Sequence, residues 1–347
     1  MLSKKRINTM LMVMALSLVL VIGVSSAIMA QEVSIKFGTG SPMDPYDASG
    51  AGAMYFEHYV ENASNGEIEV EIYPANQLGS NDEMLEQVKR GTIQMATSMG
   101  SGQLASKYYP NFYMFDIPYL FKNAQAAWEV VKPSNPLMSK MMDDMAEKTN
   151  VRPLSFYVEG SRHFTNDVRP ITKPEDMEGL KIRTMTVEAH MEMVKALGAS
   201  PTPIAYSELY GAMQTGVVDG QENPIGNIDY LKAYEVQDYL VLDGHITYMV
   251  PAIINEDFFR GLSEEHQQIV REGALEFARV NNTMAKVGNM EGLENVKENG
   301  MTVTTLDSEA LQAFRKKTQP VVREFVEEQV DDPELIEELL NEIKKYE

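Results

Sequence analysis

The sequence predicts a two-lobed α/β protein with mixed, mostly parallel sheets and one long helix that spans both lobes. Its 347 residues, 44% hydrophobic and 23% charged, have a composition typical of about two globular domains. Strand-like segments alternate with helical segments along the chain, which favours parallel sheets covered on both faces. From Ser263 to about Asn299 the pattern is helical and only glycines interrupt it, so one long or kinked helix can cross both lobes.

The first thirty residues have the features of a secretory signal peptide. Three basic residues at positions 4–6 precede an apolar run over about 10–24, and small residues follow as far as Ala30. This run is shorter than the roughly 20 residues needed to cross a bilayer, so an uncleaved anchor is the weaker interpretation. We therefore predict a cleavable leader over 1–30, a periplasmic protein, and no stable membrane insertion after cleavage.

The absence of cysteine and the negative net charge limit the kinds of partner that the exported chain can bind. The sequence has no cysteine, so it offers neither a lipid-attachment site nor disulfides. Removing the leader deletes three positive charges and no negative ones, which changes the formal net charge from −21 to −24. Nucleic acid is excluded as a partner because binding phosphates requires a basic patch. An acidic protein can still bind a small anion where the site itself is locally positive.

In the first half of the mature chain, segments predicted as strands alternate with segments predicted as helices. Residues 33–37 alternate and end in a glycine turn before a helical run over about 48–63, and residues 68–73 alternate again. Ser80 and Glu83 form a capping box that opens a helix, and Gly91 ends it. The pattern continues with a strand over 93–98, two helical runs between 123 and 149, and a strand over 151–158.

The second half keeps this alternation. We expect strands over 181–184, 239–254 and 301–305, helices over about 187–197, 207–215 and 263–299, and helices beginning at Ser308 and Pro333. The predicted lobes are residues 31–159 with about 249–288, and residues 160–248 with about 289–347.

Arg183 is the first candidate for a binding residue. In the strand Gly179 to Thr184, Leu180 and Ile182 can face a core while Arg183 lies at the strand's end. Ligands of open α/β sheets bind outside the carboxyl ends of strands, and an arginine fork can hold a carboxylate with two parallel hydrogen bonds. The residues alone leave a second possibility open, an ion pair with Glu188 or Glu208.

Several separate pieces between Gly179 and Pro224 occur in an order that resembles a known family. GLKIRT, LGASPTPIAYSELYGAM and QTGVVDGQENP together resemble the solute-binding proteins of TRAP transporters, the tripartite ATP-independent periplasmic carriers of organic acids. The resemblance implies a Venus-flytrap periplasmic binding protein that holds an organic acid, most simply a C4-dicarboxylate or a sugar acid. It also implies a partner, a TRAP membrane permease with a small and a large subunit, driven by an ion gradient.

The resemblance assigns roles to individual residues. Arg183 occupies the place of the arginine that holds the ligand's carboxylate, and Arg162 in VEGSRHFTN matches an arginine that makes a second contact. Asn223 of DGQENP matches an asparagine that hydrogen-bonds the ligand. From the residues alone, Arg162 can equally be a surface arginine, and Asn223 can equally be a helix N-cap before Pro224.

Further cleft residues follow from the same resemblance. Tyr206 in PIAYSELY stands where the family has an aromatic residue lining the cleft, and a tyrosine can cover a carbon skeleton and offer a hydroxyl. Core packing is the competing interpretation. Tyr46, Asp47, Ser98 and Met99 occupy positions that face the cleft in the family. The chain lacks the Asn and Glu that sialic-acid-binding members carry near this cleft, which disfavours sialic acid.

Signatures of catalysis are missing from the sequence. The five histidines show no HExxH spacing, there is no thiol, and no nucleophile elbow or phosphate loop occurs. We therefore expect no metal, no cofactor and no enzymatic activity. Two alternatives stay open at this point: a secreted enzyme acting on a carboxylate, and the binding component of an ABC importer or a sensor.

Overall fold

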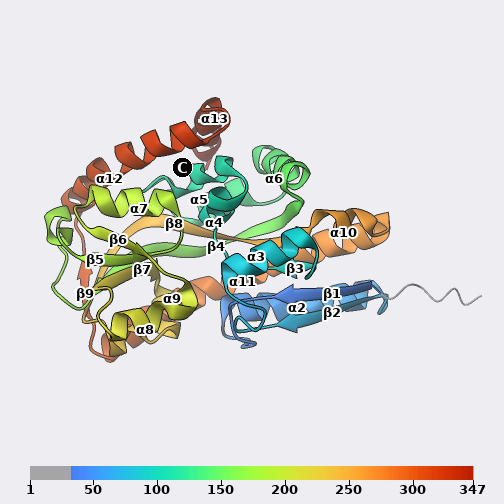
Figure 1. Ribbon diagram of the computed structural model, residues 1–347, viewed down its shortest axis with the longest axis horizontal. Coiled ribbons are helices and arrows are strands. Elements are labelled where there is room, and N and C mark those ends of the chain that lie inside the picture. Colours follow the sequence, from blue (N-terminus) through green and yellow to red (C-terminus); the bar gives the residue numbers. More distant parts are fainter. Residues whose placement is uncertain (1–32, 347) are drawn as a thin grey trace, which may run out of the picture.

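The computed structural model describes residues 33–346, so the predicted leader over 1–30 lies outside the described residues. One sheet of nine strands runs through the molecule in the order β2-β1-β3-β8-β4-β7-β5-β6, with β9 beside β8. In Figure 1, β1 and β2 lie at one end of the molecule and β5, β6 and β7 at the other. The strands are β1 Val33–Gly38, β2 Ile68–Tyr73, β3 Met95–Ala96, β4 Val151–Asn166, β5 Lys181–Thr184, β6 Ser200–Pro203, β7 Gly220–Pro224, β8 Tyr239–Asn255 and β9 Thr302–Thr305.

The two long strands β4 and β8 connect the two ends of the sheet. They pair antiparallel with each other, and β3 and β7 pair antiparallel on their outer sides. The remaining pairs, β1 with β2 and β3, β5 with β6 and β7, and β8 with β9, are parallel. The prediction of a mixed, mostly parallel sheet is therefore confirmed. We call the end that holds β1 to β3 the first half and the end that holds β5 to β7 the second half.

Strand β4 is twice as long as the sequence predicted. The expected strand ended at residue 158, whereas β4 continues to Asn166 through register shifts between Val158 and Gly160 and between Arg162 and Phe164. Each shift breaks the two-residue alternation that identifies a strand, because a bulge adds a residue on one side of the pairing. This extension carries Arg162 into the middle of the sheet.

Helices cover both faces of the sheet, and several begin at the predicted caps. The Ser80 hydroxyl oxygen accepts from the Glu83 amide and the Glu83 carboxylate accepts from the Ser80 amide, which completes the expected capping box. Gly91 ends that helix in the left-handed region at φ 72°. The helices are α2 Ala48–Ala63, α3 Asn81–Arg90, α4 Ser101–Lys107, α5 Ala124–Val131, α6 Pro136–Thr149, α7 Glu188–Ala196, α8 Leu209–Gln214, α9 Ile225–Tyr230, α10 Glu256–Gly261, α11 Glu264–Glu298, α12 Ser308–Gln329 and α13 Glu334–Ile343, with 3-10 turns η1 Pro110–Asp116, η2 Pro174–Met177, η3 Tyr206–Glu208 and η4 Ala233–Glu235.

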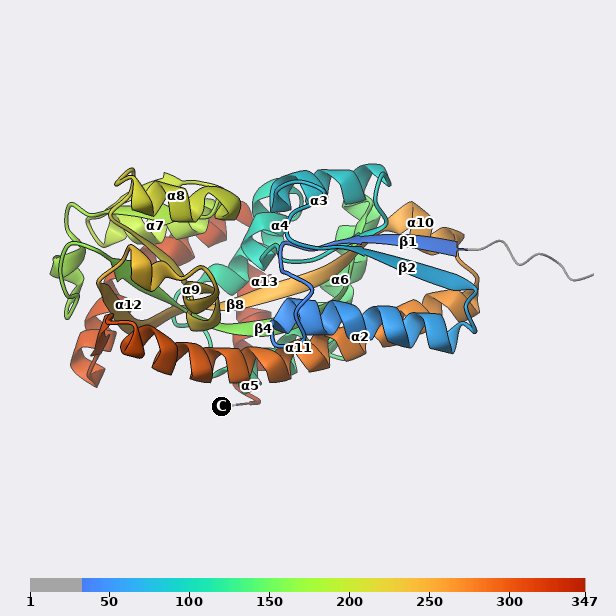
Figure 2. The ribbon, with the colours of Figure 1, turned by 90° about the horizontal axis from the view of Figure 1, so that it is seen from below.

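The long helix α11 is the predicted element that spans both halves. Its N-cap is Ser263, whose side chain accepts from the His266 amide. Figure 2 shows α11 running along one side of the molecule beside α2, and it also packs on β4 and on α9 of the second half. Gly52 on α2 allows the close approach, since a Cβ atom there would lie 2.2 Å from Oδ1 of the buried Asn281.

The C-terminal helices contact both halves. Helix α12 packs on α7 of the second half and on η1, and α13 packs on α5. The lobe boundaries given above stay a prediction.

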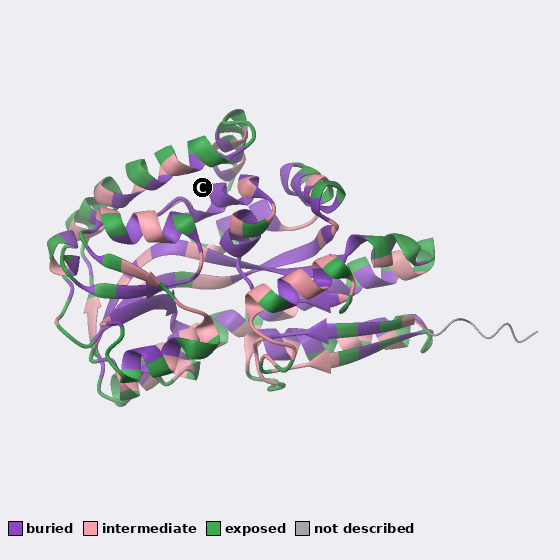
Figure 3. Cartoon of the chain, viewed as in Figure 1, coloured by how far each residue is buried: buried purple, intermediate pink, exposed green. Residues whose placement is uncertain are grey.

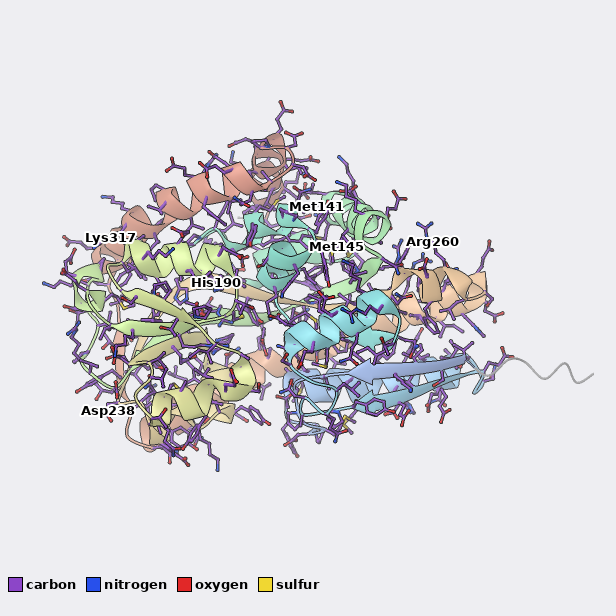
Figure 4. All side chains as sticks on the ribbon, viewed as in Figure 1. Met141, Met145, His190, Asp238, Arg260 and Lys317 are labelled. Carbon is purple, nitrogen blue, oxygen red and sulfur yellow. The ribbon has the colours of Figure 1, made fainter. Side chains whose placement is uncertain are left out.

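The core follows the inner faces of the helices and the central strands, which are the buried parts of Figure 3. Aromatic pairs join the layers: the Phe37 and Phe56 rings lie 5.5 Å apart, and Tyr157 lies 5.7 Å from Phe277 of α11. Met141 and Met145 of α6 are buried in this core, whereas Arg260 of α10 points outward (Figure 4).

Candidate functional site

A cavity of about 90 Å³ lies where β4 and β8 pass between the two halves, and both halves line it. Most of its lining residues have polar side chains, and four of them are tyrosines whose rings add apolar surface. The lining residues are Gly40, Ser41, Asp47, Ser49, Ser80, Asn81, Asp82, Ser98, Gln103, Tyr157, Glu159, Arg183, Met185, Thr186, Ile204, Ala205, Tyr206, Asn223, Asn227, Tyr230 and Tyr248.

Arg183 lines this cavity as a buried cation without a counter-ion. It lies in β5 between β6 and β7, and only 1% of it is exposed. Its Nε donates to the Ile204 carbonyl at 2.8 Å, and Nη1 has no protein partner. Burial lowers the pKa of Arg183 to about 10, and the nearby charge of Arg162 adds to this against the attraction of Glu222. The group is therefore still charged at neutral pH and can bind an anion from the cavity.

The alternative ion pair with Glu188 is not formed. Glu188 instead accepts from the Ser106 hydroxyl at 2.7 Å and from the Tyr113 hydroxyl. None of the ion pairs recorded within residues 33–346 involves Arg183.

Arg162 is fully buried, but it lies behind the cavity wall and is absent from the lining. It forms an ion pair with Glu222, and its Nη2 donates to the Glu222 carbonyl at 2.6 Å and to Asn223 Oδ1 at 3.0 Å. Its guanidinium lies 4.4 Å from the ring centre of Tyr248, which does line the cavity. Arg162 is thus not a surface arginine; it is not among the lining residues, and its Nη1 is buried without a partner.

Asn223 lines the cavity and does not cap a helix. It belongs to β7, and the following helix α9 begins at Ile225 with Pro224 as an N-cap that makes no side-chain bond. Its Oδ1 accepts from Arg162, and its Nδ2 donates to Gln221 Oε1 at 2.5 Å. The Asn223 amide is therefore held in place by β7 and by Arg162 of β4.

The other predicted residues divide into two groups. Tyr206, Asp47 and Ser98 line the cavity together with Arg183 and Asn223. Ser98 is held in the left-handed region at φ 79°, where its Oγ accepts from the Gly40 amide at 3.1 Å.

Tyr46 and Met99 differ from the prediction, because the structure places neither in the cavity lining. The Tyr46 side chain is 80% exposed and lines a surface groove that adjoins the cavity. Met99 is fully buried, and its side chain belongs to the hydrophobic core beneath the cavity.

Two acidic residues of the cavity, Glu159 and Asp82, were not predicted from the sequence, because an anionic ligand favours cations in its site. Glu159 and Asp82 line the cavity beside Asp47. Burial raises the pKa of Glu159 to about 7, and the charge of Asp47 adds to it, while Arg162 and the Asn227 side chain oppose it. The sequence position of Glu159 could have indicated a place in the site, because Glu159 directly follows the predicted strand over 151–158 and residues at the end of a strand lie at the edge of a sheet.

A buried charged network lies behind the cavity, centred on Glu222. His245 Nε2 lies 3.3 Å from Glu222 Oε2, and His190 Nδ1 lies 3.6 Å from Glu222 Oε1. The other nitrogens of these rings face Asp243 at 2.7 Å and Asp116 at 3.3 Å. His190, labelled in Figure 4, places α7 in this network. The side chains of Glu222, His190, His245, Asp116 and Asp243 are all buried. Since water does not solvate their charges, these groups stabilise one another by pairing.

The pKa values in this network follow from its charges. Burial opposes a charge on His245, but Asp243 and Glu222 outweigh it and raise the pKa of His245 to about 9. Burial likewise opposes the charge on Glu222, but Arg162 and the two histidines hold the pKa of that carboxyl well below its usual range. Both groups are therefore ionised at neutral pH.

We expect this network to make stability fall at alkaline pH. Since the folded-state pKa of His245 lies above its ordinary 6.5, its contribution is fully present below about pH 6.5 and is lost as pH rises through about 9. Urea unfolding of the wild type and of His245→Asn at several pH values between about 6 and 9.5 measures it. The fall in unfolding free energy should be clearly smaller in the variant, and equal slopes in the two proteins would contradict the assignment.

The described residues contain neither a membrane-spanning helix nor a cluster of metal ligands. No helix within 33–346 is long and apolar enough to cross a membrane. Over the same residues, no group of three or more His, Cys, Asp and Glu side chains has an arrangement suited to a metal ion.

Comparison with known proteins gives a consistent set of relatives. A model of the family described as bacterial extracellular solute-binding protein, family 7, matches residues 40–329. The ectoine-binding periplasmic protein TeaA of Halomonas elongata is 34% identical over 285 residues, which are 81% of this chain and 82% of TeaA. The C4-dicarboxylate-binding periplasmic protein DctP of Rhodobacter capsulatus is 32% identical over 330 residues, covering 94% of this chain and 95% of that protein.

A solved structure agrees with these relatives. The sugar acid binding protein DctPAm of Advenella mimigardefordensis, crystallised with galactonate, superposes with a TM-score of 0.85 at 28% identity. The match covers 91% of this chain and 99% of that one. The predicted two-lobed α/β architecture with a long helix is thereby confirmed at the level of the fold.

Proposed function

Because the chain belongs to bacterial extracellular solute-binding protein family 7 and is a TRAP solute-binding protein, we propose that it captures an organic acid through Arg183 and delivers it to a membrane permease. The family consists of binding proteins, and like its relatives this chain is not an enzyme. The alternative of a secreted enzyme is therefore set aside.

The observation that carries the proposal is the state of Arg183. A cation that is 1% exposed, lacks a protein counter-ion and lines an internal cavity is unfavourable unless a ligand supplies the negative charge. A carboxylate matches the guanidinium fork in charge and shape. Asn223, Tyr206, Asp47 and Ser98 would surround the rest of the ligand.

The ligand class predicted from the sequence, a C4-dicarboxylate or a sugar acid, agrees with the names of two relatives. DctP is described as binding C4-dicarboxylates, and DctPAm was solved with galactonate. The carboxylate is the feature that these acids share, and Arg183 would hold it. Arg162 would act through Asn223 and Tyr248 in this arrangement, since both contact its guanidinium.

Delivery requires a periplasmic location and a membrane partner. The predicted leader over 1–30 supports export, and the acidic mature chain would meet basic or polar loops of the TRAP permease subunits. An ABC permease or a sensor as partner would use the same binding fold, and the family membership favours the TRAP permease.

Ligand binding should close the two halves on the acid. The cavity wall comes from both halves and is joined by β4 and β8, so a ligand that touches both sides stabilises the closed arrangement by its differential affinity. Small-angle scattering should show a smaller radius of gyration with saturating acid, and the melting temperature should rise. The probe is whichever of succinate, D-malate, D-galactonate and D-glucuronate gives a thermal shift.

The matched control is the corresponding alcohol without a carboxylate, which should change neither the radius of gyration nor the melting temperature. In a separate test for turnover, the acid recovered after hours of incubation with the protein should be chemically unchanged. An identical radius of gyration with and without a bound acid would contradict closure, and a thermal shift with the alcohol alone would contradict recognition of the carboxylate.

A further inference from the structure

The cavity holds more negative than positive charge, although the ligand proposed above is an acid. Arg183 is the one cationic side chain among its lining residues, whereas Asp47, Asp82 and Glu159 all line it. Asp82 is partly compensated, because Lys107 lies 3.7 Å from its Oδ2 and Gln103 donates to its Oδ1 at 3.1 Å. None of the ion pairs within residues 33–346 involves Asp47 or Glu159, and the charge of Arg162, which acts on Glu159, is already paired with Glu222.

Asp47 and Glu159 are two like charges of the cavity lining, and both accept hydrogen bonds from neutral groups. Asp47 caps α2 by accepting from the Gly50 amide at 2.8 Å, and Glu159 accepts from the Asn227 side chain. Burial raises the pKa of both groups; the charge of Asp44 adds to the rise at Asp47, and the charge of Asp47 adds to the rise at Glu159, whose pKa reaches about 7. Two carboxylates held together in a partly closed space are stabilised when a positive group enters between them.

The surface that adjoins the cavity is acidic as well. A groove of about 230 Å³ shares Asp47, Glu159, Asn227 and Tyr230 with the cavity, and Asp44, Asp229 and Glu291 also line it, with no lysine or arginine. A region lined by one sign of charge attracts the opposite sign and repels its own. A dianion would therefore meet repulsion at this groove and again at Asp47 and Glu159.

We propose that the ligand is an acid with one carboxylate and one cationic nitrogen, the carboxylate bound at Arg183 and the nitrogen at Asp47 and Glu159. The two ends of the cavity would then each receive the charge that they lack. This inference rests on the proposed function, because it takes the carboxylate at Arg183 as given. It places a dicarboxylate, one of the two classes predicted from the sequence, at a disadvantage.

The affinity for such a ligand should depend on pH through Glu159. The titratable groups that interact with Glu159 are Asp47, Arg162, Tyr157, Tyr206 and Tyr248, from the loop before α2, from β4, from η3 and from β8. A cationic nitrogen favours the ionised carboxylate, so its affinity should be highest above pH 7 and should fall as pH drops through about 7. A neutral hydroxyl in the same place should show a weaker dependence.

A matched ligand series tests the proposal with calorimetry on the full mature chain. Acids of three to six carbons are compared at each length with an ammonium, a hydroxyl or a second carboxylate at the far end, as in 4-aminobutanoate, 4-hydroxybutanoate and succinate. At the length that fits, the ammonium acid should bind about 10-fold or more tightly than the hydroxy acid, and the diacid more weakly than both.

Two isosteric variants test whether Asp47 and Glu159 cause the preference for the ammonium acid. Glu159→Gln and Asp47→Asn keep the hydrogen-bond acceptors and the α2 cap but remove a charge, so each should reduce the preference for ammonium about 10-fold while carboxylate binding persists. The exposed Asp257→Asn on α10, which changes net charge equally far from the cavity, should leave the preference unchanged. Tighter binding by a diacid or a hydroxy acid, or no binding by any ammonium acid, would overturn the inference. If none of the acids bound at all, the proposed function itself would be at fault.

Discussion

Replacing Arg183 by alanine should weaken carboxylate binding by about 2–5 kcal/mol, which is roughly 30-fold to several thousand-fold in affinity. The carboxylate would enter a cavity whose remaining charged groups are acidic, and no other cation of the lining could replace the lost one. Arg183→Lys should recover only part of the loss, because it returns the charge but not the planar fork.

The unliganded Arg183→Ala protein should be at least as stable as the wild type. Nη1 of Arg183 is buried without a partner and its pKa is lowered to about 10, so folding places an unfavourable charge there. Calorimetry for affinity and urea unfolding for stability separate the two effects. A folded Arg183→Ala protein with unchanged affinity for the best acid of the wild type would show that Arg183 does not hold the ligand.

Removing the charge of Glu222 should destabilise the protein more than any other single isosteric change in this region. Glu222→Gln leaves Arg162 buried opposite an amide and leaves His190 and His245 without their shared carboxylate. Breaking a buried ion pair from one side costs about 3–5 kcal/mol, because the partner's charge stays desolvated and uncompensated. Urea unfolding of Glu222→Gln against the wild type measures this loss directly.

A second variant and a surface control make the result specific. The double variant Arg162→Met/Glu222→Gln should be more stable than the sum of the single effects predicts, since the two side chains compensate each other. Glu337→Gln removes the exposed pair with Arg323 at 2.7 Å and should change stability by less than about 1 kcal/mol. Additive effects of Arg162→Met and Glu222→Gln would contradict a direct pair.

The pH prediction for His245 and the Glu222 variant concern the same network and should be coupled. With Glu222 replaced, His245 loses one of the two carboxylates that raise its pKa, although Asp243 remains at 2.7 Å. The fall in stability at alkaline pH should therefore be smaller in Glu222→Gln than in the wild type. The same unfolding series measures both effects.

Much of the fold could be predicted from local patterns in the sequence. Helix α2 over Ala48–Ala63, the capping box of Ser80 and Glu83, and the long helix after Ser263 lie where caps and apolar periodicity placed them. These signals act between residues one to four positions apart, so the sequence displays both partners together. The position of Arg183 near the end of a short strand was also a local signal, because it followed from the residues of that strand alone.

The tertiary structure alone decided which charges meet. Arg162 pairs with Glu222 60 residues away, and His190 reaches Asp116 across 74 residues. Asp47 and Glu159 come together only because β4 continues past its expected end and carries Glu159 beside the start of α2. A sequence shows that a charged side chain exists but not which partner burial will bring to it, and Coulomb energies depend on that distance and on the local dielectric. For this reason the position of Arg183 near a strand end was predictable, whereas its lack of a counter-ion and the acid pair facing the same cavity required the folded chain.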